Sequence, residues 1–189
     1  ADVAHMVELG FRELSMEPVV APAEFDYALT DEDVFAACRE YEKLGKHYVE
    51  QYKKGEPYNF FHFNVDLTGG PCLPKRLSGC GAGHDYLAIS PEGDLYPCHQ
   101  FVGDDKYLLG NIFDGVTNTA VVDEFMECNV YSREECKDCW ARLYCSGGCA
   151  ANAYHATGSV TGVYEYGCIL FRKRMECALM VAIHRALNP

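Results

Sequence analysis

The chain has 189 residues, of which 49% are hydrophobic, 13% aromatic and 23% charged. This composition excludes disorder over the whole length, and no apolar run approaches the roughly 20 residues of a membrane-spanning helix. The 28 acidic residues outweigh the 16 basic ones and give a net charge of −12, which argues against a nucleic-acid partner.

The first seventy residues predict alternating helices and strands. A short helix ending near Gly10 precedes a strand pattern within residues 11–20. Thr30 predicts the N-cap of a long helix, because three acidic residues follow it and apolar residues then recur with helical spacing. Residues 59–67 predict a second strand, with Phe61, Phe63 and Val65 on one face. Strand, helix and strand without a hairpin favour parallel pairing, so we interpret residues 1–70 as the end of a larger α/β unit.

A different pattern begins near residues 69–71 and consists of short strands, turns and cysteines. Ser90-Pro91-Glu92-Gly93 predicts a tight turn with a positive φ at the glycine, and hence a hairpin that brings Cys80 and Cys98 to the same side. Residues 121–126 predict a short helix with Val122, Phe125 and Met126 facing inward. From residue 169 onward, apolar positions repeat with helical spacing and predict a C-terminal docking helix.

Eleven cysteines form the most informative feature of the sequence, and only Cys38 precedes residue 72. An odd number, a clustered distribution and no secretory signal pattern favour metal ligands over a disulfide framework. The dense segment reads Cys136-x2-Cys139-x5-Cys145-x3-Cys149, with Cys168 downstream. With Cys80 and Cys98, these thiols nearly fill two four-coordinate centres, and such all-sulfur sets bind zinc or iron–sulfur clusters.

The spacing Cys80, Gly93-x4-Cys98, the four-cysteine run and Cys168 resembles the SPASM domain of radical S-adenosylmethionine (SAM) enzymes. Residues 94–103 and 137–153 are similar to the maturases of six-cysteine (SCIFF) peptides. The resemblance implies an α/β fold, with the end of a radical SAM partial (β/α)6 barrel at residues 1–70. It also implies a small irregular α+β SPASM domain closed by a C-terminal helix at residues 71–189.

The resemblance further implies two auxiliary [4Fe–4S] clusters in this chain. Carried over by position, Cys80, Cys98 and Cys149 hold the first cluster. The second set comprises Cys136, Cys139, Cys145 and Cys168. The fourth position of the first cluster stays open between Cys72, Cys128 and an iron that binds a substrate thiolate.

The activity implied for the parent enzyme is thioether crosslinking of a cysteine-rich ribosomal peptide precursor. A 5′-deoxyadenosyl radical removes hydrogen from an acceptor residue, and a substrate cysteine sulfur joins that carbon. The family binds SAM at a third [4Fe–4S] cluster through Cys-x3-Cys-x2-Cys, a triplet that does not occur before Cys72. We therefore expect this chain alone to be inactive. A reductant such as a flavodoxin or ferredoxin and a cytoplasmic location complete the expectation.

Three alternatives stay open: another SPASM maturase such as the sulfatase-maturating type, a cluster-carrying electron-transfer module, and a zinc-stabilised interaction domain. We expect Cys38 and Cys177 to be small core residues, and His99 to be a hydrogen-bonded bystander. Glu17 and Asp66 stand at strand ends of the α/β part, where barrel ligands occur, but we expect both to be solvated carboxylates, and the same holds for Ser15.

Overall fold

The computed structural model describes residues 2–67, 69 and 72–188. The chain divides into two compact units: Ala1–Gly70 together with Glu165–Pro189, and Pro71–Tyr164. The domain boundary predicted between Gly70 and Pro71 lies outside the described residues. Among the helices of the described residues, none combines the length and the apolar character that crossing a bilayer requires.

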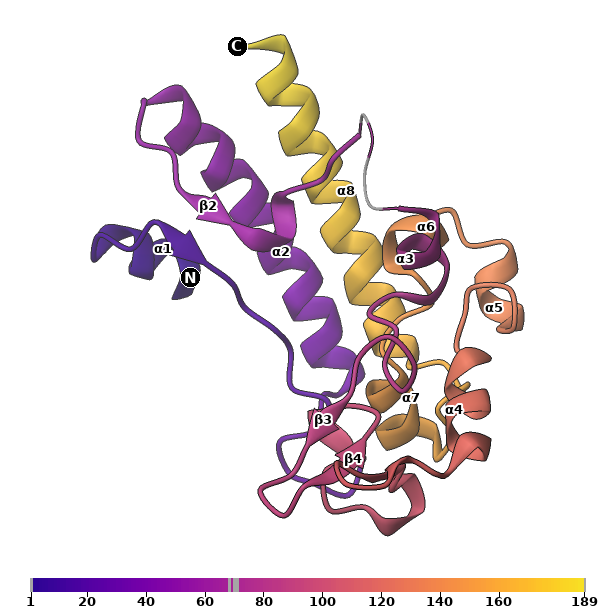
Figure 1. Ribbon diagram of the computed structural model, residues 1–189. Helices are drawn as coiled ribbons and strands as arrows, with labels where there is room; N and C mark the ends of the chain where they lie inside the picture. The colour runs from indigo at the N-terminus through magenta and orange to yellow at the C-terminus, as the bar shows by residue number, and fades with distance from the viewer. Residues whose placement is uncertain (1, 68, 70–71, 189) are drawn as a thin grey trace. The chain divides into compact units, whose positions relative to one another are not determined.

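The first unit combines two long helices with a short parallel sheet (Figure 1). Its elements are α1 (Asp2–Glu8), β1 (Glu13–Leu14), α2 (Asp31–Lys53), β2 (Asn59–Phe60), a 3₁₀ turn (Phe61–Phe63) and α8 (Glu165–Leu187). Strands β1 and β2 pair in parallel, with Glu13 opposite Asn59 and Leu14 opposite Phe60. The predicted strand–helix–strand crossover is therefore confirmed, although each strand is shorter than expected.

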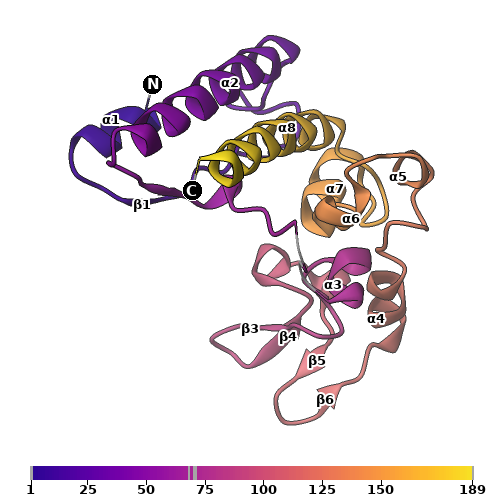
Figure 2. The same cartoon turned by 90° about the horizontal axis from the view of Figure 1, so that it is seen from above.

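Helix α2 begins where the sequence predicts. The Thr30 hydroxyl accepts a hydrogen bond from the Asp33 backbone N–H at 3.3 Å, and the Thr30 backbone N–H donates to the Asp33 carboxylate at 2.9 Å. This reciprocal capping box satisfies two backbone donors of the first turn. Helices α2 and α8 lie side by side (Figures 1 and 2). Gly45 faces Cys177 and Met180 of α8, so the absence of a side chain permits a close approach.

The segment after β2 differs from its prediction. The strand ends at Phe60, and the 3₁₀ turn that follows replaces the expected alternation of faces. Phe63 is buried, as expected, but Phe61 is 64% exposed, and Phe60 is buried instead. The prediction that Phe61 and Phe63 share a face was therefore wrong, because a 3₁₀ turn has three residues per turn rather than a period of two.

The second unit is built from short elements (Figure 2). Its helices are α3 (Leu73–Ser78), α4 (Thr119–Met126), α5 (Glu134–Lys137), α6 (Arg142–Cys145) and α7 (Ala150–Thr157). Its strands β3 (Ala88–Ile89), β4 (Asp94–Tyr96), β5 (Gly110–Asn111) and β6 (Gly115–Val116) form an antiparallel meander. The predicted hairpin is confirmed: β3 pairs with β4, and Gly93 has a φ of +92°.

An aromatic cluster forms the core of this unit. Phe101 and Tyr107 are fully buried, with ring centroids 4.5 Å apart, and Phe125 of α4 packs edge-on against both. Helix α4 turns Val121 and Phe125 inward, whereas Met126 is 56% exposed. The expectation that Met126 faces inward was wrong, because Phe125 already occupies the core and a residue one position later points about 100° away.

The C-terminal helix forms where the apolar repeat predicts it and buries Cys177 and Ala178. The sequence analysis assigned this helix to the second domain, whereas in the structure it belongs to the compact unit of residues 1–70. A compact unit and an inherited domain need not coincide, so the assignment of residues 71–189 to one domain stays a prediction.

Candidate iron–sulfur sites

The three cysteines of the first predicted ligand set come from separate segments of the second unit. Cys98 follows β4 and caps the 3₁₀ turn His99–Phe101, Cys80 follows the end of α3, and Cys149 is the N-cap of α7. Cys98 is buried, while Cys80 and Cys149 are exposed. That these three thiols form one ligand set stays a prediction.

Several nearby groups change the pKa of the Cys98 thiol. Burial raises the pKa of the Cys98 thiol, and the neighbouring thiols of Cys149 and Cys80 raise it further. The backbone N–H groups of Gln100 and Phe101 act in the opposite direction, because they donate toward the sulfur and favour the thiolate. Backbone donors aimed at a cysteine sulfur are suited to an anionic, thiolate-ligated group.

A second pair of thiols lies in and after α5. Cys136 is buried within the helix, and the Cys139 backbone N–H donates to the Cys136 carbonyl at 3.2 Å. Burial raises the pKa of the Cys136 thiol, the Arg133 guanidinium lowers it, and the nearby Cys139 thiol raises it. The tight turn therefore presents both sulfurs to one region, as the Cys-x2-Cys spacing predicts.

The connection between Cys145 and Cys149 is an uncommon backbone segment. Cys145 ends α6, and Ser146, Gly147 and Gly148 then have φ values of +59°, +83° and +84°. Ser146 is the sole residue other than glycine with a positive φ among those that the structure describes. Left-handed residues in succession reverse the chain sharply, which explains why two adjacent glycines follow Ser146.

Cys168 lies on α8, in the first unit, and its inclusion with Cys136, Cys139 and Cys145 remains a prediction. Cys72 and Cys80 stand at the two ends of α3, since Cys72 is its N-cap and Cys80 follows it directly after Gly79. Cys38 is half-buried in α2 and Cys177 is buried in α8.

Cys128 is a buried thiol with hydrogen-bond partners of its own. Its sulfur donates to the Val160 carbonyl at 3.4 Å and to the Glu124 carbonyl at 3.7 Å. Burial raises the pKa of this thiol to about 11. The single S–H is shared between these two carbonyls, and this contact pattern favours a packing role for Cys128.

The donor set fits thiolate-ligated clusters. In a four-iron cluster each thiolate binds a separate iron, so its ligands surround a bulky group rather than converge on a point. Within residues 2–67, 69 and 72–188, no three His, Cys, Asp or Glu side chains converge closely enough to hold a single metal ion. Sulfur donors from three segments, with backbone N–H groups directed at one of them, are the chemistry that a cubane cluster uses.

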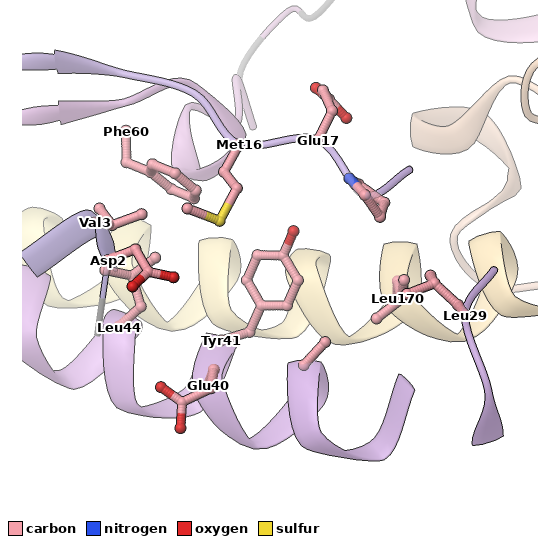
Figure 3. A pocket seen from close by; sticks show the side chains of 12 residues that line it. Asp2, Val3, Met16, Glu17, Leu29, Glu40, Tyr41, Leu44, Phe60 and Leu170 are labelled. Carbon is pink, nitrogen blue, oxygen red and sulfur yellow. The ribbon is translucent and has the colours of Figure 1, made fainter. Parts of the chain in front are cut away.

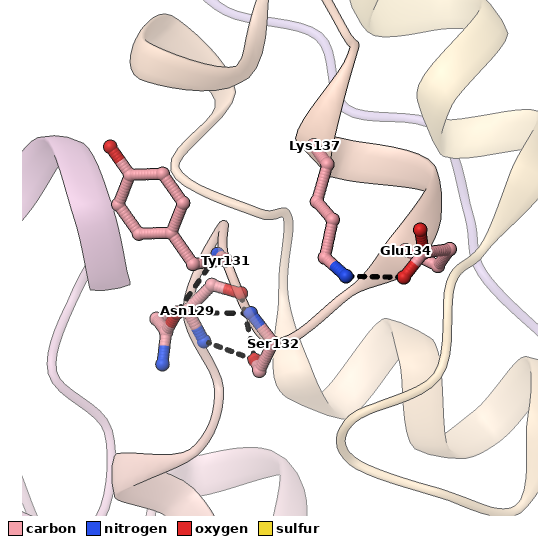
Figure 4. A network of polar contacts seen from close by, with 5 residues as sticks. All are labelled: Asn129, Tyr131, Ser132, Glu134 and Lys137. Atoms are coloured by element: carbon pink, nitrogen blue, oxygen red, sulfur yellow. Dashed lines mark hydrogen bonds and ion pairs between the residues drawn. The ribbon is translucent and has the colours of Figure 1, made fainter.

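Sequence reasoning missed Arg133, which precedes α5 and is only 2% exposed. Polar contacts in the turn before α5 and within α5 surround this segment (Figure 4). The Asn129 side chain accepts from the backbone N–H groups of Tyr131 at 2.9 Å and Ser132 at 3.2 Å, and Glu134 pairs with Lys137. A single arginine before a Cys-x2-Cys pair is no recognisable motif, so its burial becomes visible only in the folded chain.

A cavity of about 400 Å³ lies in the first unit, between β1, β2 and the long helices (Figure 3). Glu17 lines it and approaches the buried His62, with Oε1 and Nε2 2.9 Å apart. Ser15 Oγ lies 3.2 Å from the same nitrogen, and Arg174 donates to His62 Nδ1 at 2.8 Å. Burial lowers the pKa of His62, and Arg174 lowers it further. Glu17 and Ser15 are therefore partners of a buried histidine rather than simply solvated groups.

Comparisons with known proteins agree with this donor chemistry. Residues 80–140 match SPASM, described as an iron–sulfur cluster-binding domain. The mycofactocin maturase MftC of Mycolicibacterium smegmatis is 37% identical over 97 residues, which are 49% of this chain and 24% of that protein. The antilisterial bacteriocin subtilosin biosynthesis protein AlbA of Bacillus subtilis is 31% identical over 121 residues, 57% of this chain and 27% of that protein.

Among solved structures, anSMEcpe with bound AdoMet superposes with a TM-score of 0.69 at 25% identity, covering 99% of this chain and 50% of that one. The matched segments span about a quarter of the curated relatives and half of the solved one. Residues 80–140 therefore resemble the SPASM iron–sulfur cluster-binding domain, and the mixed α/β chain is similar to parts of MftC, AlbA and anSMEcpe.

Proposed function

We propose that this chain is the auxiliary-cluster portion of a radical SAM maturase that installs thioether crosslinks in a cysteine-rich ribosomal peptide precursor. In this proposal residues 1–70 complete a partial (β/α)6 barrel, and residues 71–189 form the SPASM domain with the C-terminal helix. The longer enzyme supplies the SAM-binding cluster, because this sequence has no Cys-x3-Cys-x2-Cys triplet before Cys72.

The proposal is best supported by the match of residues 80–140 to an iron–sulfur cluster-binding domain and by the electrostatic influence of the Cys80 and Cys149 thiols on Cys98. These three cysteines come from separate segments, so this influence is a product of the fold and not of local spacing. In the proposal they hold the first [4Fe–4S] cluster, and Cys136, Cys139, Cys145 and Cys168 hold the second. The left-handed segment between Cys145 and Cys149 then fixes the distance between the two ligand sets.

The fourth position of the first cluster is proposed to be either Cys72 or an iron open to substrate. The hydrogen bonds from the Cys128 sulfur to Glu124 and Val160 support a packing role for that residue instead. When bound, the clusters supply a site for the electron that is released as the thioether bond forms. The chain's own contribution is to supply the thiolates and to hold the two ligand sets at a fixed separation.

The chemistry sets the proposed partners. Crosslinking requires a peptide with both a thiol and an acceptor carbon, and cleavage of SAM requires a low-potential reductant such as a flavodoxin or ferredoxin. Oxygen damages clusters with exposed ligands, and Cys80 and Cys149 are exposed, so we propose a reducing cytoplasm as the location. The homologous maturases support a peptide substrate.

The test uses the full-length enzyme that carries this chain, with SAM, a reductant and a precursor peptide, under anaerobic conditions. The proposal expects 5′-deoxyadenosine together with a peptide that has lost two hydrogens for each crosslink, one from the thiol and one from the acceptor carbon. Tandem mass spectrometry locates the new carbon–sulfur bond. Deoxyadenosine without any loss of hydrogen from the peptide would contradict thioether formation.

A second candidate is maturation of the sulfatase type, which the structural likeness to anSMEcpe supports. The two candidates differ in the product. A sulfatase-derived peptide would be oxidised at one residue without a new carbon–sulfur bond. Its remaining cysteines would keep free thiols, so an alkylating reagent would label them as it does in the untreated peptide. The same mass spectrometry therefore distinguishes the two reactions.

A further inference from the structure

Arg133 occupies a position between the two proposed ligand sets. Its backbone carbonyl accepts from the Cys136 N–H at 3.1 Å, so the residue begins the helix that carries Cys136. Its side chain runs in another direction, toward the left-handed segment between Cys145 and Cys149. One residue thus connects both cysteine segments.

The guanidinium is held entirely by backbone carbonyls. Nη1 donates to Gly147 at 2.7 Å and Nη2 donates to Val160 at 2.9 Å. Nε is shared between Thr161 at 3.2 Å and Gly162 at 3.1 Å. These contacts tie the Cys145–Cys149 connection to the segment that leads toward α8, and they satisfy the cation with dipoles rather than with an opposite charge.

The positive charge of Arg133 has no ion-pair partner among the residues that the structure describes. A buried charge without a counter-ion is costly, and buried arginine is usually paired with a carboxylate. Backbone carbonyls satisfy the hydrogen-bond donors of this guanidinium, but no described side chain offsets its charge, so a nearby anion would be stabilised there.

The contacts of Arg133 indicate which ligand segments it adjoins. Its backbone carbonyl accepts from the Cys136 N–H, and its Nη1 donates to the carbonyl of Gly147, which lies between Cys145 and Cys149. Gly147 lies directly against the guanidinium. A Cβ at this position would lie 2.5 Å from Arg133 Nη1, so a residue other than glycine would clash with the guanidinium. The glycine at position 147 thus leaves room for the Arg133 guanidinium.

We propose that Arg133 is the internal counter-cation of the auxiliary cluster bound through Cys136, a positioning residue that offsets the cluster's negative charge and raises its reduction potential. This inference rests on the proposed function. A four-iron cluster with thiolate ligands is anionic and becomes more so on reduction, so a fixed positive charge nearby favours the reduced form. The four carbonyl contacts keep that charge in place in both oxidation states.

The test compares Arg133→Lys, which keeps the charge, with Arg133→Gln, which removes it but can still donate to carbonyls. Arg39→Gln on the exposed side of α2 is the matched control, because it changes the net charge equally. Each variant of the full chain is reconstituted anaerobically, and iron and sulfide are counted. Redox titration followed by electron paramagnetic resonance then gives the midpoint potential of each cluster.

We expect Arg133→Gln to shift one of the two potentials to a more negative value, or to lose that cluster. Arg133→Lys should stay closer to the wild type, and Arg39→Gln should match it. Equal behaviour of Arg133→Lys and Arg133→Gln, whether both are intact or both are defective, would overturn the role of the charge. Wild-type chain that binds no iron and sulfide would instead overturn the proposed function, so the two failures are distinguishable.

Discussion

The two compact units are stabilised in different ways. The first depends on regular structure: two helices of 23 residues each pack along their length, and α2 begins with a complete capping box. The second has no helix longer than eight residues among those described, and an aromatic cluster and single side-chain contacts hold its loops. We infer that the first unit folds by helix packing, whereas the cysteine loops of the second depend on cluster binding for much of their order.

The largest expected effect is a difference in iron content between a cysteine variant of the second unit and one of the first. Cys98→Ala removes a thiolate from the proposed first ligand set, and we expect loss of roughly half of the bound iron, because one four-iron cluster of two no longer assembles. Cys177→Ala is the matched control, since Cys177 is also a buried thiol but lies in the helix packing of the first unit. Iron and sulfide analysis of both reconstituted proteins measures the difference. Equal iron content would remove Cys98 from the ligand set.

The next effect concerns a glycine of the cysteine loops. Gly147→Ala places a side chain at a φ of +83° and 2.5 Å from Arg133 Nη1. Left-handed backbone alone costs about 1–2 kcal/mol for a residue with a Cβ, and displacement of the buried guanidinium adds to that cost. Denaturant unfolding of the metal-free chain, followed by a probe in the second unit, should show the loss. An unchanged midpoint would contradict the tight contact.

A smaller effect tests the regular unit. Thr30→Ala removes the hydroxyl that caps α2, and we expect the first unit to lose about 1 kcal/mol of unfolding free energy. Iron content should stay the same, because the helix start is remote in sequence from every proposed ligand. Circular dichroism during denaturation measures the stability. A fall in iron content with unchanged stability would contradict the assignment of Thr30 to the helix packing of the first unit.

The smallest expected change in stability concerns Gly45 of the first unit, where an added Cβ would also meet a neighbouring side chain, as at Gly147. Gly45 has an ordinary helical conformation, and a Cβ there would meet the terminal methyl of Met180 at 2.9 Å. That flexible group can move, and alanine gains roughly 0.5–1 kcal/mol of helix propensity, so we expect Gly45→Ala to change stability by only a few tenths of a kcal/mol. A loss as large as that of Gly147→Ala would show that helix contact, not backbone conformation, decides the cost.

Local sequence signals predicted the elements that local physics determines. Thr30 with Asp33 marks the start of α2, and Ser90-Pro91-Glu92-Gly93 marks the turn between β3 and β4. Both features depend on residues within a few positions of one another. The 3₁₀ turn at Phe61–Phe63 was missed, because an aromatic run fits strand alternation equally well until tertiary packing selects Phe60 and Phe63 for burial.

The candidate site was predictable only in part. Cysteine spacing and the resemblance to SPASM domains identified which thiols to consider, and in the structure the Cys80 and Cys149 thiols influence the pKa of Cys98. The hydrogen bonds of Cys128 and the burial of Arg133 could not be foreseen, since both depend on carbonyls about 14 to 32 positions away in sequence. Long-range contacts to backbone atoms leave no trace in a sequence pattern.

The most direct test of the central claim is anaerobic reconstitution of the chain, with iron, acid-labile sulfide and zinc counted per chain and the visible spectrum recorded. Two four-iron clusters predict about eight iron and about eight sulfide, with broad absorbance near ~400 nm. About two zinc ions in a colourless protein would contradict the account, and would assign the same thiolates to structural metal sites instead.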